Sequence, residues 1–327
     1  MTILVLIHSP FRMWRIPLAH VERLQQDFPH HTILHARDVA EAGALVERAD
    51  VAFSSQINPD HLRAAPRLRW IHSPAAGIAG MLSPEMLASA VVLTNSRGLA
   101  ADTIAEHVLA VTLALFRRLP LAFARQAGKT WAQDEISAPP GNRMLRGAAV
   151  VLVGLGAIGS TTALRMHALG ATVTGIRRRV SAPIPSGVSA VRPFEELHAV
   201  LPHADVLILA APQTKLTRGL IGARELALMK PDGVLVNVSR GGLVDEEALA
   251  AALRAGRIAS AALDVFHDEP LGPESPLWDV PNLLITPHTS GFRPDHWDAA
   301  TDLFAENLRR FERGEELLNV VDKQAGY

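Results

Sequence analysis

Residues 148–159, AAVVLVGLGAIG, decide the fold of this chain. An apolar run leads into Gly154, Gly156 and Gly159, and a helical pattern, Ile158–Leu169, follows. The order G-x-G-x-x-G is weak by itself, but a strand before it, a helix behind it and a second apolar run at the spacing of a βαβ unit predict a dinucleotide-binding turn. Gly154 permits the tight turn, Gly156 lets the backbone approach a pyrophosphate, and Gly159 lets helix and strand pack closely.

Strand and helix patterns alternate along the rest of the chain, which is typical of parallel α/β folds. The predicted strands are Ile3–Ile7, Thr32–His35, Val51–Ser54, Trp70–His72, Val91–Thr94, Ala149–Val153, Thr172–Ile176, Val206–Ala210, Val234–Val238, Ala261–Val265 and Leu283–Thr286. The predicted helices are Leu18–Phe28, Glu41–Arg48, Ala101–Arg118, Ile158–Leu169, one between an N-cap at Asp245 and a terminating Gly256, and Trp297–Arg313. The segment Pro120–Arg146, with Pro139, Pro140 and Gly141 near its end, is expected to be an irregular arm or linker.

Composition limits the possible partners. The 327 residues are 48% hydrophobic and 20% charged, which indicates a folded globular protein of two α/β domains, because single cores seldom exceed roughly 250–300 residues. The formal net charge of −1 gives no field that attracts nucleic acid or an anionic membrane, so neither is expected as a partner. The absence of cysteine excludes disulfides, thiolate zinc sites and cysteine nucleophiles. The short N-terminal apolar run lacks a basic flank and a cleavage site, so it is interpreted as a buried strand of a cytoplasmic protein.

The turn after the second nucleotide-binding strand predicts the cofactor. Ala157 and Ile158, at the start of the helix, are expected to offer N–H groups to the phosphates. Residues 177–179 are three arginines, where an NAD enzyme usually carries an acidic residue on the ribose 2′-hydroxyl. Guanidinium groups bind a 2′-phosphate with charge-assisted hydrogen bonds, so NADP(H) is preferred over NAD(H), with Arg177 and then Arg178 as contacts. The alternative is a solvated, charged turn.

Three residues fit the needs of keto-acid reduction. Arg240, Glu269 and His288 each follow a predicted strand of the nucleotide-binding region. Because ligands bind at the carboxyl ends of parallel strands, these side chains are expected to meet in one crevice. They would supply a cation for the substrate, a partner for the imidazole and a proton donor. Each has an ordinary alternative: a surface ion pair, a solvated turn acid, or one of 14 histidines without a chemical role.

Taken together, these motifs resemble the D-isomer-specific 2-hydroxyacid dehydrogenase family, in particular its glyoxylate/hydroxypyruvate reductases. The segments that carry the resemblance extend over nearly the whole chain: NSRGLAADTIAEHVLA (95–110), VGLGAIG (153–159), APQTKLTRGLI (211–221), LVNVSRGGLVDEEAL (235–249), ALDVFHDEPL (262–271), SPLWDVPNLLITPHTSG (275–291) and NLRRFERGEELLNVVD (307–322).

The resemblance implies roles for individual residues. Arg240 would bind the substrate carboxylate and carbonyl, and His288 would be the acid/base, hydrogen-bonded to Glu269. Asp264 would hold the nicotinamide carboxamide, with Thr103 near the ring. The other implied contacts are Pro212, Thr217 and Val238 with the cofactor, and Ala76 and Gly77, in the loop Ser73–Gly77, with the substrate carboxylate.

The resemblance also implies an architecture and an assembly. A Rossmann-type doubly wound sheet, residues 101–288, would be inserted into a smaller flavodoxin-like substrate domain, residues 1–100 plus 289–327. The family commonly forms homodimers, and the arm Pro120–Arg146 would be the embracing segment. Trp131 of this arm would either reach the neighbouring site or pack within the dimer contact.

The resulting hypothesis is hydride transfer between a nicotinamide cofactor and a small 2-keto or D-2-hydroxy acid, with glyoxylate and hydroxypyruvate as first candidates. A dehydrogenase of formate or phosphite remains an alternative, and so does a dinucleotide-sensing binding protein like the corepressors that share this fold. A metal enzyme that uses His31 and His35 is not expected, because a strand at TILHA does not set up a helical metal face.

Overall fold

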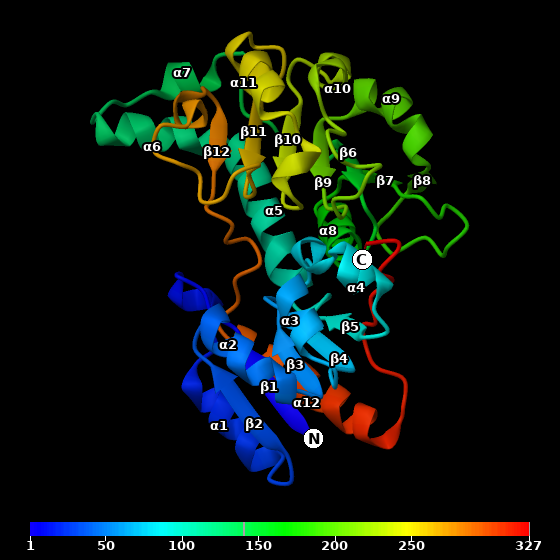
Figure 1. The fold of residues 1–327 in the computed structure, drawn as a ribbon. Coiled ribbons are helices and arrows are strands. Elements are labelled where there is room, and N and C mark those ends of the chain that lie inside the picture. Colours follow the sequence, from blue (N-terminus) through cyan, green and yellow to red (C-terminus); the bar gives the residue numbers. More distant parts are fainter. Residues whose placement is uncertain (140, 327) are drawn as a thin grey trace. The chain divides into compact units, whose positions relative to one another are not determined.

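The computed structural model describes residues 1–139 and 141–326, and the chain forms two compact units (Figure 1). The first unit comprises Met1–Leu99 and Arg293–Tyr327, and the second comprises Ala100–Phe292. Pro140 of the predicted arm and Tyr327 lie outside the described residues.

The second unit is built on a seven-stranded parallel sheet with the order β12-β11-β10-β9-β6-β7-β8. Its strands are β6 (Ala149–Val153), β7 (Thr172–Ile176), β8 (Ala190–Arg192), β9 (Val206–Leu209), β10 (Val234–Asn237), β11 (Ser260–Leu263) and β12 (Leu283–Ile285). Six of these strands were predicted. The edge strand β8 was missed because its three residues carry no repeating pattern.

Helices cover both faces of this sheet. They are α5 (Ala101–Phe116), α6 (Leu119–Ala127), α7 (Gln133–Ser137), α8 (Ala157–Ala168), α9 (Leu197–Val200), α10 (Ala223–Leu228) and α11 (Glu246–Arg254). Alternate residues of β6 belong to two separate cores: Val150 and Leu152 pack with α5 and α8, whereas Val151 and Val153 pack with the cluster that includes α11. This double burial explains why the strands are continuously apolar rather than alternating.

The residues predicted to begin and end α11 are confirmed. The Asp245 side chain accepts a hydrogen bond from the backbone N–H of Ala248, and Gly256 follows the helix with a φ of +63°.

The prediction of an irregular segment over Pro120–Arg146 is wrong for residues 120–127 and 133–137, which belong to α6 and α7. Pro120 lies in the first turn of α6, where a missing N–H costs nothing, so this proline begins a helix rather than breaking one. Residues 141–144 are irregular, as expected.

The first unit has a five-stranded parallel sheet with the order β2-β1-β3-β4-β5. Its strands are β1 (Thr2–Leu6), β2 (Thr32–Ala36), β3 (Val51–Ser54), β4 (Trp70–Ser73) and β5 (Val92–Asn95), and its helices are α1 (Leu18–Asp27), α2 (Val39–Leu45), α3 (Pro59–Ala64), α4 (Pro84–Ala88) and α12 (His296–Arg313). The chain returns to this unit at Arg293, and Phe304 of α12 stacks on Phe53 and Trp70 of the sheet, with ring centroids 4.4 and 5.3 Å away. These apolar contacts attach the last helix to the first strands.

Among the described residues no single helix is long and apolar enough to cross a membrane. Only α5 and α6 together, bent by 67° at their junction, meet the criteria of length and composition.

Candidate active site

Three adjacent loops of the second unit bring Arg240, Glu269 and His288 to one edge of the sheet. The loops follow β10, β11 and β12, which are neighbours in the sheet. The register aligns the last residues of these strands, since Asn237 pairs with Leu263 and Leu263 with Ile285. The shared strand ends place the three loops side by side at the carboxyl edge, where open α/β sheets bind ligands.

His288 and Glu269 form a close pair. The imidazole Nδ1 lies 2.6 Å from Oε2 of Glu269, while Oε1 accepts a hydrogen bond from the backbone N–H of Phe266 at 2.9 Å. Burial raises the pKa of Glu269, but the hydrogen bonds from His288 and Phe266 and the charges of His288 and Arg240 lower it further, and the net shift is downward. An ionised carboxylate only accepts hydrogen bonds, so Nδ1 carries a proton and Nε2 is left for another partner. The histidine side chain is 42% exposed.

The turn that carries His288 has an unusual backbone, held by a buried carboxylate. His288 has a φ of +52°, in the left-handed region that non-glycine residues rarely adopt. Asp264, 1% exposed, accepts hydrogen bonds from the Thr286 hydroxyl (2.6 Å), the Thr289 N–H (2.9 Å) and the Ser290 N–H (2.9 Å). The carboxylate therefore clamps the chain on both sides of the histidine. It uses three of its roughly four lone-pair positions, which leaves one on Oδ2 for a ligand.

Arg240 is a half-buried cation beside this pair. Its guanidinium donates to the carbonyl of Ser239 at 2.6 Å, and its own carbonyl accepts from the Asn237 side chain at 3.0 Å. Burial lowers the pKa of Arg240 and the charge of Glu269 raises it, but a guanidinium stays charged at neutral pH. Gly241, which the sequence analysis did not select, makes this arrangement possible: a Cβ there would lie 1.9 Å from the backbone of Phe266, in the loop that carries Glu269.

The glycine turn after β6 has the geometry of a dinucleotide cradle. A Cβ on Gly159 would lie 1.9 Å from the carbonyl oxygen of Gly154, so helix α8 reaches its position only with glycine there. Gly154 has a φ of +96° and closely approaches the backbone of Ala211. At Gly156, by contrast, nothing lies within 4 Å of the position that a Cβ would occupy. Two glycines thus shape the turn, and the third leaves open space at the N-terminus of α8, next to the exposed Ala157 and the half-buried Ile158.

The arginines after β7 do not all point outward. The guanidinium of Arg177 donates to the carbonyls of Ala182 and Pro183 and so closes its own loop. Arg178 and Arg179 are exposed. The residue expected to contact the ribose first therefore organises the loop, and its two neighbours are exposed residues of the same loop.

The other predicted cofactor residues differ in accessibility. Thr217 is buried, and its hydroxyl donates to the carbonyl of Pro212 at 2.7 Å and accepts from the N–H of Thr214 at 2.8 Å, which closes the loop after β9. Pro212 itself is exposed, Val238 is buried in the core, and the Thr103 hydroxyl donates to the carbonyl of Ala100 at 3.1 Å.

In the first unit, Ala76 and Gly77 lie in an exposed loop after β4. The Asn95 side chain donates to the carbonyl of Ala76 at 2.7 Å, and the Ser73 hydroxyl accepts from the N–H of Ala75 at 3.2 Å. Within residues 1–139 and 141–326, the N–H groups of Ala76 and Gly77 donate to no protein acceptor. They are therefore available to an anion.

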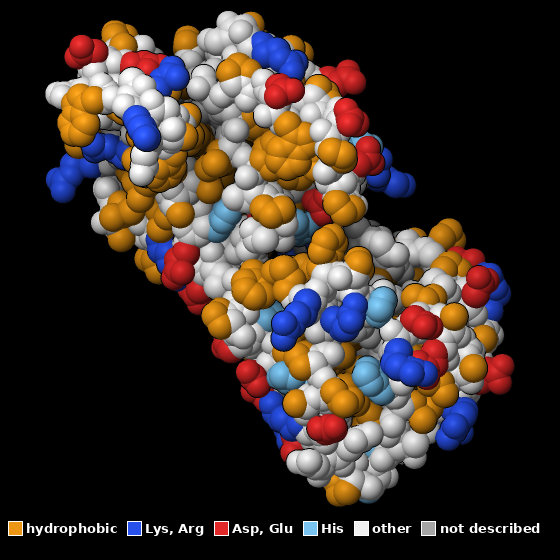
Figure 2. All heavy atoms as spheres, turned by 90° about the vertical axis from the view of Figure 1, so that its left-hand side faces the viewer, with side chains coloured by type: hydrophobic (Ala, Val, Ile, Leu, Met, Phe, Trp, Pro, Cys, Tyr) orange, Lys and Arg blue, Asp and Glu red, His pale blue; other side chains and the backbone are white. Residues whose placement is uncertain are grey.

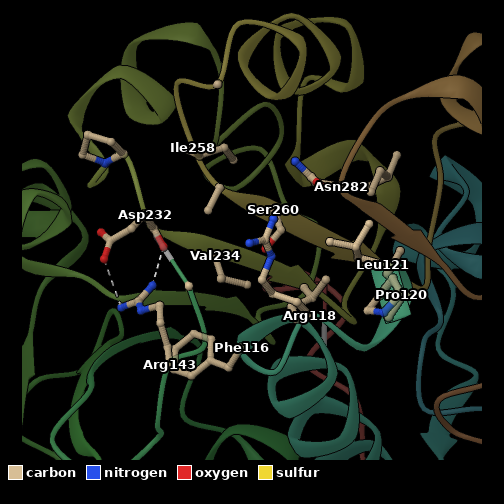
Figure 3. A pocket seen from close by; sticks show the side chains of 17 residues that line it. Phe116, Arg118, Pro120, Leu121, Arg143, Asp232, Val234, Ile258, Ser260 and Asn282 are labelled. Carbon is tan, nitrogen blue, oxygen red and sulfur yellow. Dashed lines mark hydrogen bonds and ion pairs between the residues drawn. The ribbon is translucent and has the colours of Figure 1, made fainter. Parts of the chain in front are cut away.

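A pocket of the second unit lies at the opposite edge of its sheet (Figure 3). Its lining includes Val234, Ser260 and Leu283, the first residues of β10, β11 and β12. Phe116, the last residue of α5, and Arg118, which precedes α6, also line it. Because it opens at the amino ends of strands whose carboxyl ends carry His288 and Arg240, it is not the site of the chemistry described above.

Comparison with known proteins identifies the family. Residues 109–290, more than half of the chain, match the model of the D-isomer specific 2-hydroxyacid dehydrogenase, NAD binding domain. The chain belongs to this family. It is therefore an NAD(P)-dependent oxidoreductase with a two-domain α/β fold, as the sequence predicted.

Relatives of this dehydrogenase include a glyoxylate reductase of Pyrococcus furiosus, 31% identical over 318 residues that cover 94% of each chain. A D-3-phosphoglycerate dehydrogenase of Mycobacterium tuberculosis is 33% identical over 88% of this chain, which spans only 52% of that longer protein. Among solved structures, an NADPH-dependent glyoxylate/hydroxypyruvate reductase of Sinorhizobium meliloti, in complex with NADP and sulfate, matches 100% of this chain and 99% of its own, with a TM-score of 0.84 and 28% identity.

Proposed function

We propose that this dehydrogenase reduces a small 2-keto acid of the glyoxylate or hydroxypyruvate type to the D-2-hydroxy acid, with NADPH as the preferred hydride donor. The observation that carries the proposal is the His288–Glu269 pair, 2.6 Å apart beside the half-buried Arg240, at the sheet edge that also carries the glycine turn. The names of the relatives support the substrate class, since several are glyoxylate reductases.

The residues of the turn fit the cofactor. The open space beside Gly156 at the N-terminus of α8 suits a pyrophosphate, and the remaining lone pair of Asp264 suits a carboxamide N–H. When bound, the reduced nicotinamide supplies the hydride for the keto carbon.

The protein's own residues would then complete the reaction. Arg240 binds the substrate and stabilises the negative charge that develops on the carbonyl oxygen, a contribution on the order of 3–4 kcal/mol for one such donor. His288 donates a proton to that oxygen from Nε2, while Glu269 holds the Nδ1–H and orients the ring. In the first unit, the N–H groups of Ala76 and Gly77 are proposed as donors to an anion, because paired backbone donors suit small anions.

The test is oxidation of NADPH and NADH by the purified protein with a panel of 2-keto acids. Reduction of NADP⁺ and NAD⁺ is then measured with formate or phosphite as the hydride donor. We expect turnover with small keto acids, and a loss of at least a hundredfold in kcat for His288→Gln with cofactor binding retained. Cofactor binding without turnover of any acid would contradict the proposal and favour a sensing protein.

The cofactor preference rests on the exposed Arg178 and Arg179, with Arg177 holding the loop from which they project. Charge-assisted hydrogen bonds contribute about 1.5–3 kcal/mol, so Arg178→Asp should lower kcat/KM for NADPH by roughly 10–150-fold and leave NADH turnover unchanged. Arg177→Asp should weaken both cofactors by loosening the loop. Arg48→Asp, in the first unit, controls for the change of net charge. Equal use of both cofactors by the wild type would discard the arginine argument.

We also propose a homodimer through α6 and α7. Phe123 of α6 is 64% exposed and Trp131, just before α7, is 91% exposed. Figure 2, viewed from the side of these helices, shows apolar side chains gathered on this face of the second unit. Such exposure is typical of an interface rather than of a free surface.

Light scattering should give twice the chain mass for the wild type and one chain mass for Phe123→Ser; a monomeric wild type would refute the dimer. A Trp131→Ala dimer with a raised substrate KM would indicate that this residue reaches the neighbouring site.

A further inference from the structure

Two histidines and a glutamate of the first unit gather outside every site described so far. His30 and His31 directly precede β2, and Glu312 lies in the last turn of α12. The Nε2 atoms of both histidines lie 2.9 Å from the same carboxylate oxygen, Oε1 of Glu312. One ligand atom of each of the three residues lies within 4.8 Å of the other two.

His31 is the buried member of this cluster. Its side chain is 5% exposed, and its ring stacks on Phe28 with an interplanar angle of 4°. Although Oε1 of Glu312 is 2.9 Å away, Nε2 of His31 has no hydrogen-bond partner among the described residues, so the carboxylate oxygen lies off the direction of a hydrogen bond. A buried ring nitrogen without a hydrogen bond, facing a carboxylate and a second imidazole, has the surroundings of a metal ligand.

We propose that His30, His31 and Glu312 form a binding site for one divalent transition-metal ion of the zinc class, with solvent in the remaining positions. Two imidazoles and one carboxylate suit zinc or cobalt, whereas magnesium and calcium prefer oxygen ligands. The ion would join the start of β2 to the end of α12, and thus hold the helix that returns from the second unit onto its own sheet.

The test uses untagged, chelator-treated full-length protein titrated with Co²⁺, whose visible absorption reports its coordination. We expect one Co²⁺ per chain with the absorption of a four- or five-coordinate site, displacement by stoichiometric Zn²⁺, and no displacement by excess Mg²⁺. His30→Gln and Glu312→Gln change partly or largely exposed residues and should fold normally, as circular dichroism will show, yet bind Co²⁺ at least tenfold more weakly.

The matched control is His20→Gln. His20 on α1 pairs with Asp298 on α12 at 3.2 Å, so this variant removes a histidine–carboxylate pair between the same layers without touching the cluster. It should retain full affinity for Co²⁺. Absorption typical only of hydrated, six-coordinate Co²⁺ would overturn the proposal, as would equal affinities in wild type, His30→Gln and Glu312→Gln.

Discussion

Replacing Asp264 by asparagine tests how the turn that bears His288 is held. In the wild type, Oδ1 accepts hydrogen bonds from Thr286 and Thr289, and Oδ2 accepts one from Ser290. The asparagine side chain loses fewer hydrogen bonds when its oxygen takes the Oδ1 position, which accepts two of them. Its NH₂ group then faces the N–H of Ser290. One buried donor then loses its acceptor, which costs about 1–3 kcal/mol.

This loss should affect both stability and turnover. For a domain of this size it lowers the melting temperature by about 2–12 °C. The left-handed conformation of His288, φ +52°, costs roughly 1–2 kcal/mol by itself, so a weakened clamp lets the turn relax. Displacement of a catalytic group by about 1 Å can cost on the order of 100-fold, and we expect kcat to fall by roughly 10–100-fold.

The assay is calorimetric unfolding together with steady-state kinetics for Asp264→Asn. Asp245→Asn is the matched control, because asparagine caps helices as well as aspartate does and α11 should keep its stability. Unchanged kcat and melting temperature would refute the clamp. A higher KM for the cofactor with unchanged kcat would assign Asp264 to the carboxamide alone.

Three further predictions concern the fold and its response to pH. Gly159→Ala should destabilise the second unit by about 1–3 kcal/mol, because its Cβ meets a carbonyl oxygen at 1.9 Å, whereas Gly156→Ala should fold normally and lose only cofactor affinity; equal melting temperatures would contradict this. Burial lowers the pKa of His72 to about 3, so the unfolded chain binds a proton that the folded chain refuses. The contribution of His72 to the free energy of unfolding is therefore complete above pH ~6.5. It is lost as the pH falls, and at pH 5 the free energy of unfolding is lower by about 2 kcal/mol. Denaturant titrations should show a shallower pH dependence for His72→Gln, and an identical slope would refute the assignment. Phe304→Ala should destabilise the first unit by about 3–5 kcal/mol, since it removes a fully buried ring stacked on Phe53; a loss below about 1 kcal/mol would show that the core collapses around the vacancy.

Local patterns predicted much of the fold. The continuous apolar strands required a sheet covered on both faces, and Asp245 and Gly256 marked the ends of α11 because capping is decided within a few residues. Local patterns failed where a strand was too short to show a period, or where one residue type had two interpretations. Pro120 reads as a helix breaker, yet it begins α6, and the three residues of β8 carry no period.

The candidate site was predictable by residue type but not by geometry. Arg177 follows β7 as expected, but the sequence does not say that its guanidinium meets the carbonyls of Ala182 and Pro183. The role of Asp264 in holding the His288 turn was also hidden, since its partners are mainly backbone N–H groups 25 and 26 residues further along the chain. Such partners have no side-chain signature in a sequence.

Backbone contacts also explain why this chain reveals its reaction class more readily than its substrate. Glu269 is held by the N–H of Phe266, the His288 turn by Asp264, and the Arg240 loop by Asn237. These contacts lie within three neighbouring loops of one sheet, so under the proposed mechanism they hold His288 and Arg240 in the same way whatever acid is bound. Discrimination between acids must then come from groups outside these loops. Two substrates of equal charge and different side chains should therefore show similar pH profiles with this enzyme and differ mainly in KM.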